Sequence, residues 1–406
     1  MPPPRIAVVS PFIDKLHGTE RNVAECIQRL SGEYEIHVYS NRVEDVDLSR
    51  ITWHRIPALS GPHLFAFLWW FVANHLWRWS DRWLRGLAPD VLYSPGINCL
   101  DADAITVHVV FARLLENVRA ELRFARNPAR TWPRVIHRRL YYRLVQSLER
   151  HVYRRPNQSL GAVSQKVSKD LAYYYGRTEK VRVVYTGLDL SRFNPVGRAA
   201  LRPEARAKLG LADNNFALLL IGNGWKNKGL PSVLDAAGIL QDPRLVLLVA
   251  GEDDASPYQA AIQHHHLTGR VHFLPPRRDV DFFYAAADAY VGPSLEDSFG
   301  QPPAEAMACG LPVIVSRNAG CAEIISHGED GLVLEDPRDV QTLAAWIRRL
   351  IDDSEFRRGL AENAARTAQK LTWEINTAAM KALFEQARGS VEDQRASRRE
   401  SSFEKK

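Results

Sequence analysis

The sequence predicts an α/β protein of two domains, each built on a doubly wound parallel β-sheet. Its 406 residues exceed one typical domain and suffice for two, each with its own core. In both halves, short apolar segments of strand type alternate with segments of helix length. This alternation is typical of parallel sheets covered by helices on both faces, which bind ligands beyond the carboxyl ends of their strands.

The first half opens with a strand at residues 6–10, a loop through Gly18, a helix near 22–30 and a strand at 36–39. These segments predict a β-α-β unit. Further strands are predicted at residues 91–93, 104–107, 159–163 and 181–185. The apolar stretch Leu64–Leu76 is about 13 residues long, short of the roughly 20 that span a bilayer. It predicts a buried or interfacial helix, and we expect it to pack in the core.

The second half alternates more regularly. Its strands are predicted at residues 216–221, 245–250, 271–274, 289–291, 312–315 and 331–334. Turn residues between Gly187 and Pro195 indicate the boundary, so that one domain covers residues 1–190 and the next 191–372. A C-terminal helix is expected at residues 373–389. The charged, Ser- and Arg-rich residues 390–406 predict a disordered tail.

Cysteine usage and the N-terminus favour a cytoplasmic protein. The four cysteines lack the spacing of metal ligands and the density of a disulfide framework. The first apolar run, which follows Met1–Arg5, is too short for a signal peptide. We therefore expect the protein to remain in the cytoplasm. Because the cysteines lack metal-ligand spacing, we also expect no resident metal.

Arginines crowd the segment from Arg113 to Arg155, although the net charge of the whole chain is only +6. They stand at positions 113, 119, 123, 126, 130, 134, 138, 139, 143, 150, 154 and 155, with Trp132, Tyr141, Tyr142 and Tyr153 among them. A basic aromatic helical surface favours peripheral contact with the anionic inner face of the cytoplasmic membrane. RNA binding and a simple solvated face are the alternatives, and we expect no nucleic acid.

Residues 293–312 carry the strongest functional signal, because they combine two carboxylates, a glycine turn and a helix start. Pro302 and Pro303 suit the first positions of a helix, which Gly310 ends. Glu305 is then expected in the first helical turn, where free N–H groups can hold phosphate, and Asp297 in the loop before it. Without further context, a dipole-compensating glutamate and a solvated loop aspartate are the simpler interpretation.

This segment resembles the signature of the retaining nucleotide-sugar glycosyltransferases with the GT-B fold, of the group 1 and family 4 type. That signature is Glu, seven residues, then Glu, followed by Ala-Met-Ala-x-Gly-x-Pro-Val. The matching residues are Asp297, Ser298, Phe299, Gly300, Glu305, Ala306, Met307, Ala308, Gly310, Pro312 and Val313. Asp297 stands where the family usually has Glu, and Glu296 lies one position out of register.

Three other segments extend the resemblance. Gly222, Gly224 and Lys228 resemble the family's diphosphate loop, in which Asn223 replaces the usual Arg and Lys226 compensates, as in relatives that build lipopolysaccharide cores. His17, Gly18 and Glu20 resemble its Gly-Gly-x-Glu-Arg loop, with His17 in place of a glycine. Residues Thr106–Phe111 follow a strand, and the resemblance assigns His108 a contact with the transferred sugar. Without that context, a lone histidine after a strand is more often a packed residue.

The resemblance implies two Rossmann-like domains that face a central cleft and a C-terminal helix that crosses back to the first domain. It implies that Glu305 binds the ribose, that Asp297 and His108 bind the sugar, and that Asn318–Glu323 shapes the nucleotide pocket. Lys228, the Gly222–Gly224 loop and the backbone N–H groups of Phe299 and Gly300 would stabilise the departing diphosphate.

The expected reaction is transfer of a hexose from a UDP-linked donor to a cell-envelope glycan or lipid-linked acceptor. It is expected to retain the configuration of the anomeric carbon and to need no metal. No side chain stands out as a nucleophile, so a same-face displacement is expected. The alternatives are a sugar phosphorylase or nucleotide-sugar epimerase with the same fold, and a non-catalytic membrane- or RNA-binding protein on a transferase scaffold.

Overall fold

The computed structural model describes residues 3–16, 18–118 and 132–403 of the chain. Two compact units divide it: unit 1 comprises Met1–Tyr185 and Trp373–Lys406, and unit 2 comprises Thr186–Thr372. The first unit thus ends before the residue 190 that the turn residues suggested. Leu188 N donates to Leu371 O at 2.7 Å, which joins the connecting segment to the end of unit 2.

Unit 1 is built on a seven-stranded sheet with the order β5-β3-β1-β6-β7-β8-β9, in which every pair is parallel. The strands are β1 (Arg5–Val9), β3 (Glu35–Ser40), β5 (Thr52–Arg55), β6 (Val91–Pro95), β7 (Ala104–Val107), β8 (Ser159–Ala162) and β9 (Val181–Val183). In the central strand, Ile6 pairs with both Ile36 and Val91. Two short strands, β2 (Phe12–Ile13) and β4 (Arg42–Val43), pair beside this sheet. The predicted strands of this half are confirmed.

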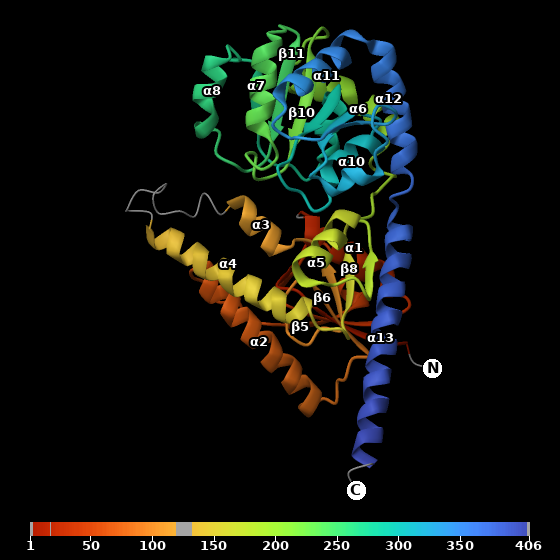
Figure 1. Cartoon of the computed structure of the whole chain (residues 1–406). Coiled ribbons are helices and arrows are strands. Elements are labelled where there is room, and N and C mark those ends of the chain that lie inside the picture. Colours follow the sequence, from red (N-terminus) through yellow and green to blue (C-terminus); the bar gives the residue numbers. More distant parts are fainter. Residues whose placement is uncertain (1–2, 17, 119–131, 404–406) are drawn as a thin grey trace. The chain divides into compact units, whose positions relative to one another are not determined.

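The helices of unit 1 surround this sheet (Figure 1). They are α1 (Gly18–Leu30), α2 (His63–Leu84), α3 (Phe111–Val118), α4 (Trp132–Tyr153), α5 (Gln165–Tyr175), α13 (Trp373–Phe403) and the 3-10 turn η1 (Leu48–Arg50). Ser164 caps α5 by accepting from Val167 N, and Gly176 ends it at a φ of 66°.

The C-terminal helix α13 belongs to unit 1, where it packs on α1 and on strands β6 to β9. Leu383 and Phe384 lie in the same core cluster as Val23 and Ile27 of α1. The helix continues to Phe403, so the disordered tail expected from residue 390 differs from the structure. Five of residues 390–403 are Arg or Glu, and such good helix formers extend a helix whose start is anchored by packing.

The expectation of core packing for Leu64–Leu76 is wrong. Helix α2 buries Trp70, Ala73, Asn74 and Asp81, whereas large apolar side chains on its other face are exposed. This exposed set, the α2 stripe, is Phe65, Leu68, Trp69, Val72, Leu76, Trp79 and Trp83. Its spacing of three or four residues is that of one helix face. Among the described residues, no helix has the length and apolar character needed to cross a bilayer.

Unit 2 contains a six-stranded parallel sheet with the order β12-β11-β10-β13-β14-β15. The strands are β10 (Phe216–Ile221), β11 (Leu245–Ala250), β12 (Val271–Leu274), β13 (Ala289–Gly292), β14 (Val313–Ser316) and β15 (Leu332–Leu334). The chain runs outward from β10 to β12 and then places β13 on the other side of β10. This reversal is the topological switch point of the sheet.

The sheet of unit 2 is covered by helices in the order that the sequence predicts. They are α6 (Pro195–Lys208), α7 (Leu230–Leu240), α8 (Gln259–His264), α9 (Asp281–Ala286), α10 (Gln301–Ala308), α11 (Val340–Asp352) and α12 (Ser354–Ala368), with 3-10 turns η4 (Ser256–Tyr258) and η5 (Gly320–Ile324). The predicted strands of the second half are confirmed.

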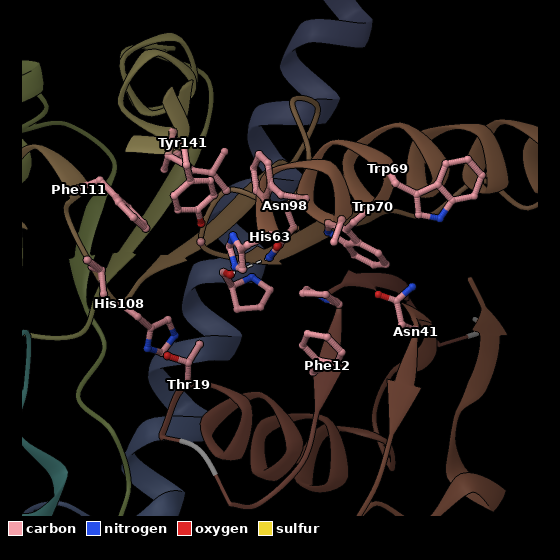
Figure 2. A pocket seen from close by; sticks show the side chains of 18 of the residues that line it. Phe12, Thr19, Asn41, His63, Trp69, Trp70, Asn98, His108, Phe111 and Tyr141 are labelled. Carbon is pink, nitrogen blue, oxygen red and sulfur yellow. Dashed lines mark hydrogen bonds between the residues drawn. The ribbon is translucent and has the colours of Figure 1, made fainter. Parts of the chain in front are cut away.

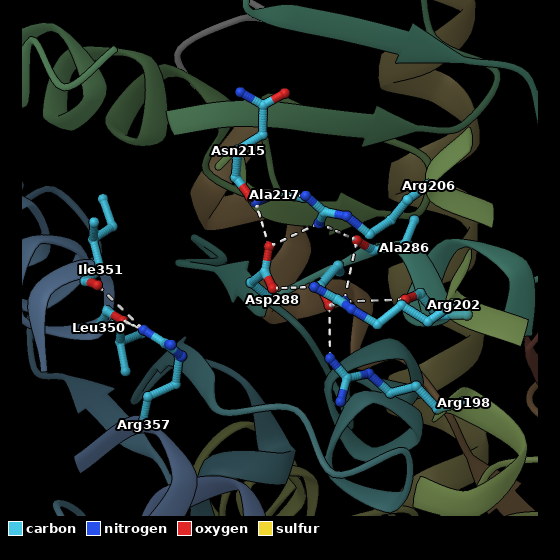
Figure 3. Close-up of polar contacts among 12 residues, drawn as sticks. Arg198, Arg202, Arg206, Asn215, Ala217, Ala286, Asp288, Leu350, Ile351 and Arg357 are labelled. Atoms are coloured by element: carbon cyan, nitrogen blue, oxygen red, sulfur yellow. Dashed lines mark hydrogen bonds and ion pairs between the residues drawn. The ribbon is translucent and has the colours of Figure 1, made fainter. Parts of the chain in front are cut away.

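Asp288 anchors the two central strands of this sheet at their amino ends (Figure 3). It accepts from Arg202 at 2.5 Å, from Arg206 at 3.1 Å and from Ala217 N at 2.8 Å. Arg198 donates to Ala287 O at 2.7 Å. These bonds join α6 to the starts of β10 and β13, and so fix two strands that each lead into a loop at the opposite edge of the sheet.

Candidate functional site

Two loops leave the sheet of unit 2 at the switch point. Residues 222–229 connect β10 to α7, and residues 293–300 connect β13 to α10. Because β10 and β13 are neighbours, both loops begin at the same place on the carboxyl edge of the sheet. They contain most of the residues singled out from the sequence: Gly222, Gly224, Lys226, Lys228, Asp297, Ser298, Phe299 and Gly300.

The two loops pack directly on each other through backbone. Gly229 has a φ of 86°, and a Cβ atom on it would lie 2.2 Å from Pro293 O. Leu295 N donates to Asn227 O at 2.7 Å, and the Asn227 side-chain amide donates to Glu296 O at 2.6 Å. Glycine is therefore required at residue 229 both for its conformation and for this close approach.

Lys228 and Asp297 form an ion pair between these loops. Lys228 Nζ lies 2.5 Å from Asp297 Oδ2, and the two side chains are 17% and 16% exposed. A Cβ atom on Gly222 would lie 3.4 Å from Lys228 Cε, so the glycine turn also borders the lysine stem. The pair places one cation and one carboxylate, both still open to solvent, at the edge where a ligand of this fold would bind.

The loop after β14 fixes the backbone of Asp297. Asp297 N donates to Asn318 O at 3.1 Å, and Gly320 N donates to Asp297 O at 3.0 Å. Cys321 N donates to Phe299 O at 2.5 Å. The segment Asn318–Glu323 thus supports the loop that carries Asp297, and its role in shaping a nucleotide pocket stays a prediction.

Helix α10 begins directly after this loop. Gly300, its N-cap, has a φ of 89°, and a Cβ atom there would lie 3.0 Å from Cys321 Sγ. Pro302 stands within the first two helical positions, as the sequence predicts. The expectation that Glu305 lies in the first turn is wrong, because the helix starts at Gln301 and its first turn holds no acidic residue.

Glu305 is a buried residue of the following turn. Its exposed fraction is 3%, and its Oε2 accepts from the Tyr284 hydroxyl at 2.8 Å. Burial, reinforced by the Glu305 charge, raises the pKa of Tyr284, so the tyrosine remains a donor near neutral pH. The carboxylate is therefore oriented by α9 before any ligand binds.

The loop after β11 contributes two acidic residues that the sequence interpretation missed. Asp253 accepts from Trp225 N, and Asn223 Oδ1 accepts from Glu252 N at 3.0 Å. Both bonds hold the Gly222–Gly224 turn, from which the side chain of Lys226 remains exposed. The signal was present, because Gly251, Glu252 and Asp253 follow directly on a buried apolar strand.

His108 and Gly18 belong to unit 1, whereas the residues described above belong to unit 2. His108 Nε2 lies 3.1 Å from Thr106 Oγ1, which bonds to the Tyr93 hydroxyl at 2.8 Å. Burial lowers the pKa of His108 to about 4, so the imidazole is neutral near pH 7. Gly18 begins α1. His17, and the arginines at 119, 123, 126 and 130, lie outside the described residues.

His108 also lines a pocket of about 390 Å³ between α2, α4 and the loops after β1, β6 and β7 (Figure 2). Glu149 of α4 forms part of its wall and is fully buried. Its carboxylate accepts from Phe111 N at 2.9 Å, Ala112 N at 3.2 Å and the Tyr175 hydroxyl at 2.5 Å. Burial outweighs these donors and raises the pKa of Glu149 to about 7.

In the parts of the chain that the structure describes, no group of three or more His, Cys, Asp or Glu residues is arranged to hold a metal ion.

Comparisons with known protein families divide the chain at nearly the same place as its fold. The model described as glycosyltransferase family 4 matches residues 16–192, and that described as glycosyl transferases group 1 matches residues 202–367. The D-inositol 3-phosphate glycosyltransferase of Jonesia denitrificans is 32% identical over 232 residues, 53% of each chain. The N,N'-diacetylbacillosaminyl-diphospho-undecaprenol alpha-1,3-N-acetylgalactosaminyltransferase of Campylobacter jejuni is 31% identical over 182 residues, 45% of this chain and 48% of that protein. The chain spans about half the length of the curated relatives it matches.

Solved structures match over nearly the whole length. WaaG, a glycosyltransferase involved in lipopolysaccharide biosynthesis, superposes with a TM-score of 0.75 over 93% of this chain and 98% of its own, at 21% identity. Anabaena HepE in complex with UDP-glucose gives a TM-score of 0.70 at 20% identity, over 93% of this chain and 99% of its own. At these identities the likeness establishes the fold.

Proposed function

The chain belongs to the glycosyltransferases of group 1 and family 4 and has the GT-B fold, and we propose that it transfers a hexose from a UDP-linked sugar to an acceptor hydroxyl. The observation that carries this proposal is the Lys228–Asp297 pair, which two glycine loops hold at the switch point of unit 2. A cation beside the backbone N–H groups of a helix start suits a diphosphate, and a carboxylate beside it suits sugar hydroxyls.

In the proposed reaction, the bond between the sugar C1 and the β-phosphate oxygen breaks as the acceptor oxygen bonds to C1 on the same face. The acceptor hydroxyl is the nucleophile and the leaving phosphate takes its proton, so no nucleophilic side chain or resident metal is needed. Lys228 and the N–H groups of Phe299 and Gly300 stabilise the developing charge on the diphosphate. Because Asp297 already pairs with Lys228, its role is to position the sugar and the lysine together.

The remaining roles follow the resemblance. Glu305 binds the ribose hydroxyls, held in place by Tyr284. Gly222, Gly224 and Ser298 border the donor, and the exposed Lys226 supplies a further charge near the phosphates. His108 contacts the transferred sugar as a neutral hydrogen-bonding group, in keeping with its lowered pKa. Gly18 lies on the acceptor side, in unit 1.

The proposed acceptor is a cell-envelope glycan or a lipid-linked sugar. The Campylobacter relative, named for the acceptor N,N'-diacetylbacillosaminyl-diphospho-undecaprenol, supports the lipid-linked class. We propose that the protein works in the cytoplasm at the inner face of the cytoplasmic membrane, where such acceptors are held.

Helices α2 and α4 support a peripheral membrane contact. Both run along unit 1 (Figure 1), and the Tyr141 ring of α4 meets His63 and Phe67 of α2 at centroid distances of 4.7 and 5.6 Å. Helix α4 exposes the apolar stripe Trp132, Ile136 and Leu140 together with Arg134, Arg138 and Arg143. Exposed apolar side chains flanked by arginines suit an interface of anionic lipid. Stronger co-sedimentation with phosphatidylglycerol vesicles than with phosphatidylcholine vesicles is the expected result; preferential binding of polyuridylate RNA would contradict it.

The donor proposal is tested with UDP-, GDP- and ADP-glucose, by thermal stabilisation and by slow hydrolysis. We expect UDP-glucose to stabilise the wild type against heat and to be hydrolysed with release of UDP. Asp297→Asn keeps the size and shape of the side chain but removes its charge, and it should weaken both effects. NMR during early hydrolysis should detect the α anomer of glucose first, as retention requires. Absence of a response to all three donors would contradict the proposal.

The same assay separates the alternative enzymes. Sugar release from an oligosaccharide that depends on inorganic phosphate would indicate a phosphorylase, and conversion of the donor to its epimer without UDP release would indicate an epimerase. Membrane binding without any donor response would indicate a non-catalytic scaffold.

A further inference from the structure

Several polar side chains that line the pocket of unit 1 are already hydrogen-bonded within the protein. The amide of Asn98 donates to Pro95 O at 2.8 Å and to Ser94 Oγ at 3.3 Å, and that of Asn41 donates to Ile56 O at 3.0 Å. Both Glu149 oxygens accept from backbone N–H groups. A sugar would need donors and acceptors directed into the pocket, because buried hydroxyls without partners are costly.

Most of the remaining wall is apolar and aromatic. Phe12, Phe67, Trp70, Phe111, Tyr141 and Val145 enclose the space. Figure 2 shows Trp69 and Trp70 on one side of it and Phe111 and Tyr141 on the other. Its volume of about 390 Å³ lies in the range of small-molecule sites, which are typically lined by such side chains.

The pocket borders the apolar face of α2 at Trp69. Trp69 lines the pocket and is also 38% exposed as a member of the α2 stripe. Its Nε1 donates to Pro57 O at 2.8 Å, which fixes the ring at this border. Phe65, Leu68 and Val72 continue the apolar surface outside. At the other end of the pocket lies His108, at the carboxyl end of β7 (Figure 2).

From this geometry, and resting on the proposed function, we propose that the pocket binds the hydrocarbon chain of a lipid-linked acceptor. The carbons nearest the headgroup lie among the aromatic rings of α2 and α4. The chain leaves past Trp69 along the α2 stripe into the membrane, and the headgroup lies toward His108. The continuity of the pocket with an exposed apolar face argues for a chain anchored in lipid over a free, compact ligand.

The test is equilibrium binding of farnesyl phosphate, a single-chain prenyl phosphate, to the full-length protein below its micelle concentration. Ala66 of α2 lines the pocket without a bulky side chain, so Ala66→Trp fills the space. We expect one saturable site on the wild type and at least tenfold weaker binding to Ala66→Trp. Ala58→Trp, on the loop wall, should act in the same direction without altering a helix. Ala378→Trp, an exposed alanine of α13, is the matched control and should bind as the wild type does.

Equal binding to the wild type and to both pocket variants would overturn the proposal, as would complete displacement of the probe by inorganic phosphate. Hydrolysis of UDP-glucose by the same wild-type sample is measured separately. A protein that hydrolyses the donor but binds no farnesyl phosphate contradicts only this inference. A protein that binds the probe in the Trp-sensitive manner but has no donor response contradicts only the proposed function.

Discussion

The candidate site of unit 2 and the pocket of unit 1 are assembled in different ways. In unit 2, short loops after β10, β13 and β14 contact one another mainly through backbone, and their glycines permit the close approach. In unit 1, helices far apart in sequence enclose the pocket with side chains. A site made of backbone and glycine tolerates little change, whereas a site made of helix faces can change its ligand while the sheet stays the same.

The largest effect is expected where backbone touches backbone. Gly229→Ala would bring Cβ onto Pro293 O, in addition to the strain of a positive φ, and should lower the free energy of unfolding by more than about 3 kcal/mol. Gly210 has a φ of 65°, and a Cβ atom added there would meet no atom within 4 Å, so Gly210→Ala should cost only about 1 kcal/mol. Urea unfolding measures both. Equal losses would show that the contact between the loops is unimportant.

The next largest effect is expected on the rate of donor hydrolysis, and it should distinguish the two lysines of the loop after β10. Removing the Lys228 amino group leaves Asp297 without its partner and the diphosphate without its charge. Lys228→Ala should therefore slow donor hydrolysis by about 100-fold. The exposed Lys226 is the matched control, and Lys226→Ala should slow it less than about fivefold. A reversed order would move the diphosphate contact to Lys226.

A smaller, pH-dependent effect is expected in unit 1. Because the pKa of Glu149 is about 7 in the folded chain and near 4.5 when exposed, the folded state keeps a proton that the unfolded state loses. The free energy of unfolding should then fall by on the order of 2 kcal/mol as pH rises from about 4.5 to about 7. Glu149→Gln should remove this slope. Denaturant unfolding at a series of pH values measures it, and an unchanged slope in Glu149→Gln would contradict the assignment.

The smallest effect on stability is expected on the α2 stripe. Trp79 and Trp83 are 62% and 72% exposed, so each change to Ser should alter the free energy of unfolding by less than about 0.5 kcal/mol. Binding to phosphatidylglycerol vesicles should nevertheless weaken. Trp70, which is 4% exposed on the same helix, is the contrast, because Trp70→Ser should cost about 3 kcal/mol or more. A stability loss at Trp79 and Trp83 like that at Trp70 would indicate that the stripe is covered by protein.

The sequence predicted the sheets and the loops of unit 2 because each is encoded locally. Buried parallel strands are continuous apolar runs, and the turns of the site contain their own glycines and prolines. The position of Glu305 was misjudged by one turn, since the helix start depends on the conformation of Gly300. The exposure of α2 was missed because a sequence does not reveal whether an apolar helix has a partner. The pocket depends on contacts between α2 and α4, which are distant in sequence, so no local sequence pattern predicts it.

Hydrogen exchange of the full-length protein with and without UDP, GDP or ADP tests most directly whether the loops at the switch point hold the donor. We expect one nucleotide to protect the amides of residues 222–229 and 297–301, and Lys228→Ala to abolish this protection. Protection confined to other segments, or none with any nucleotide, would contradict it.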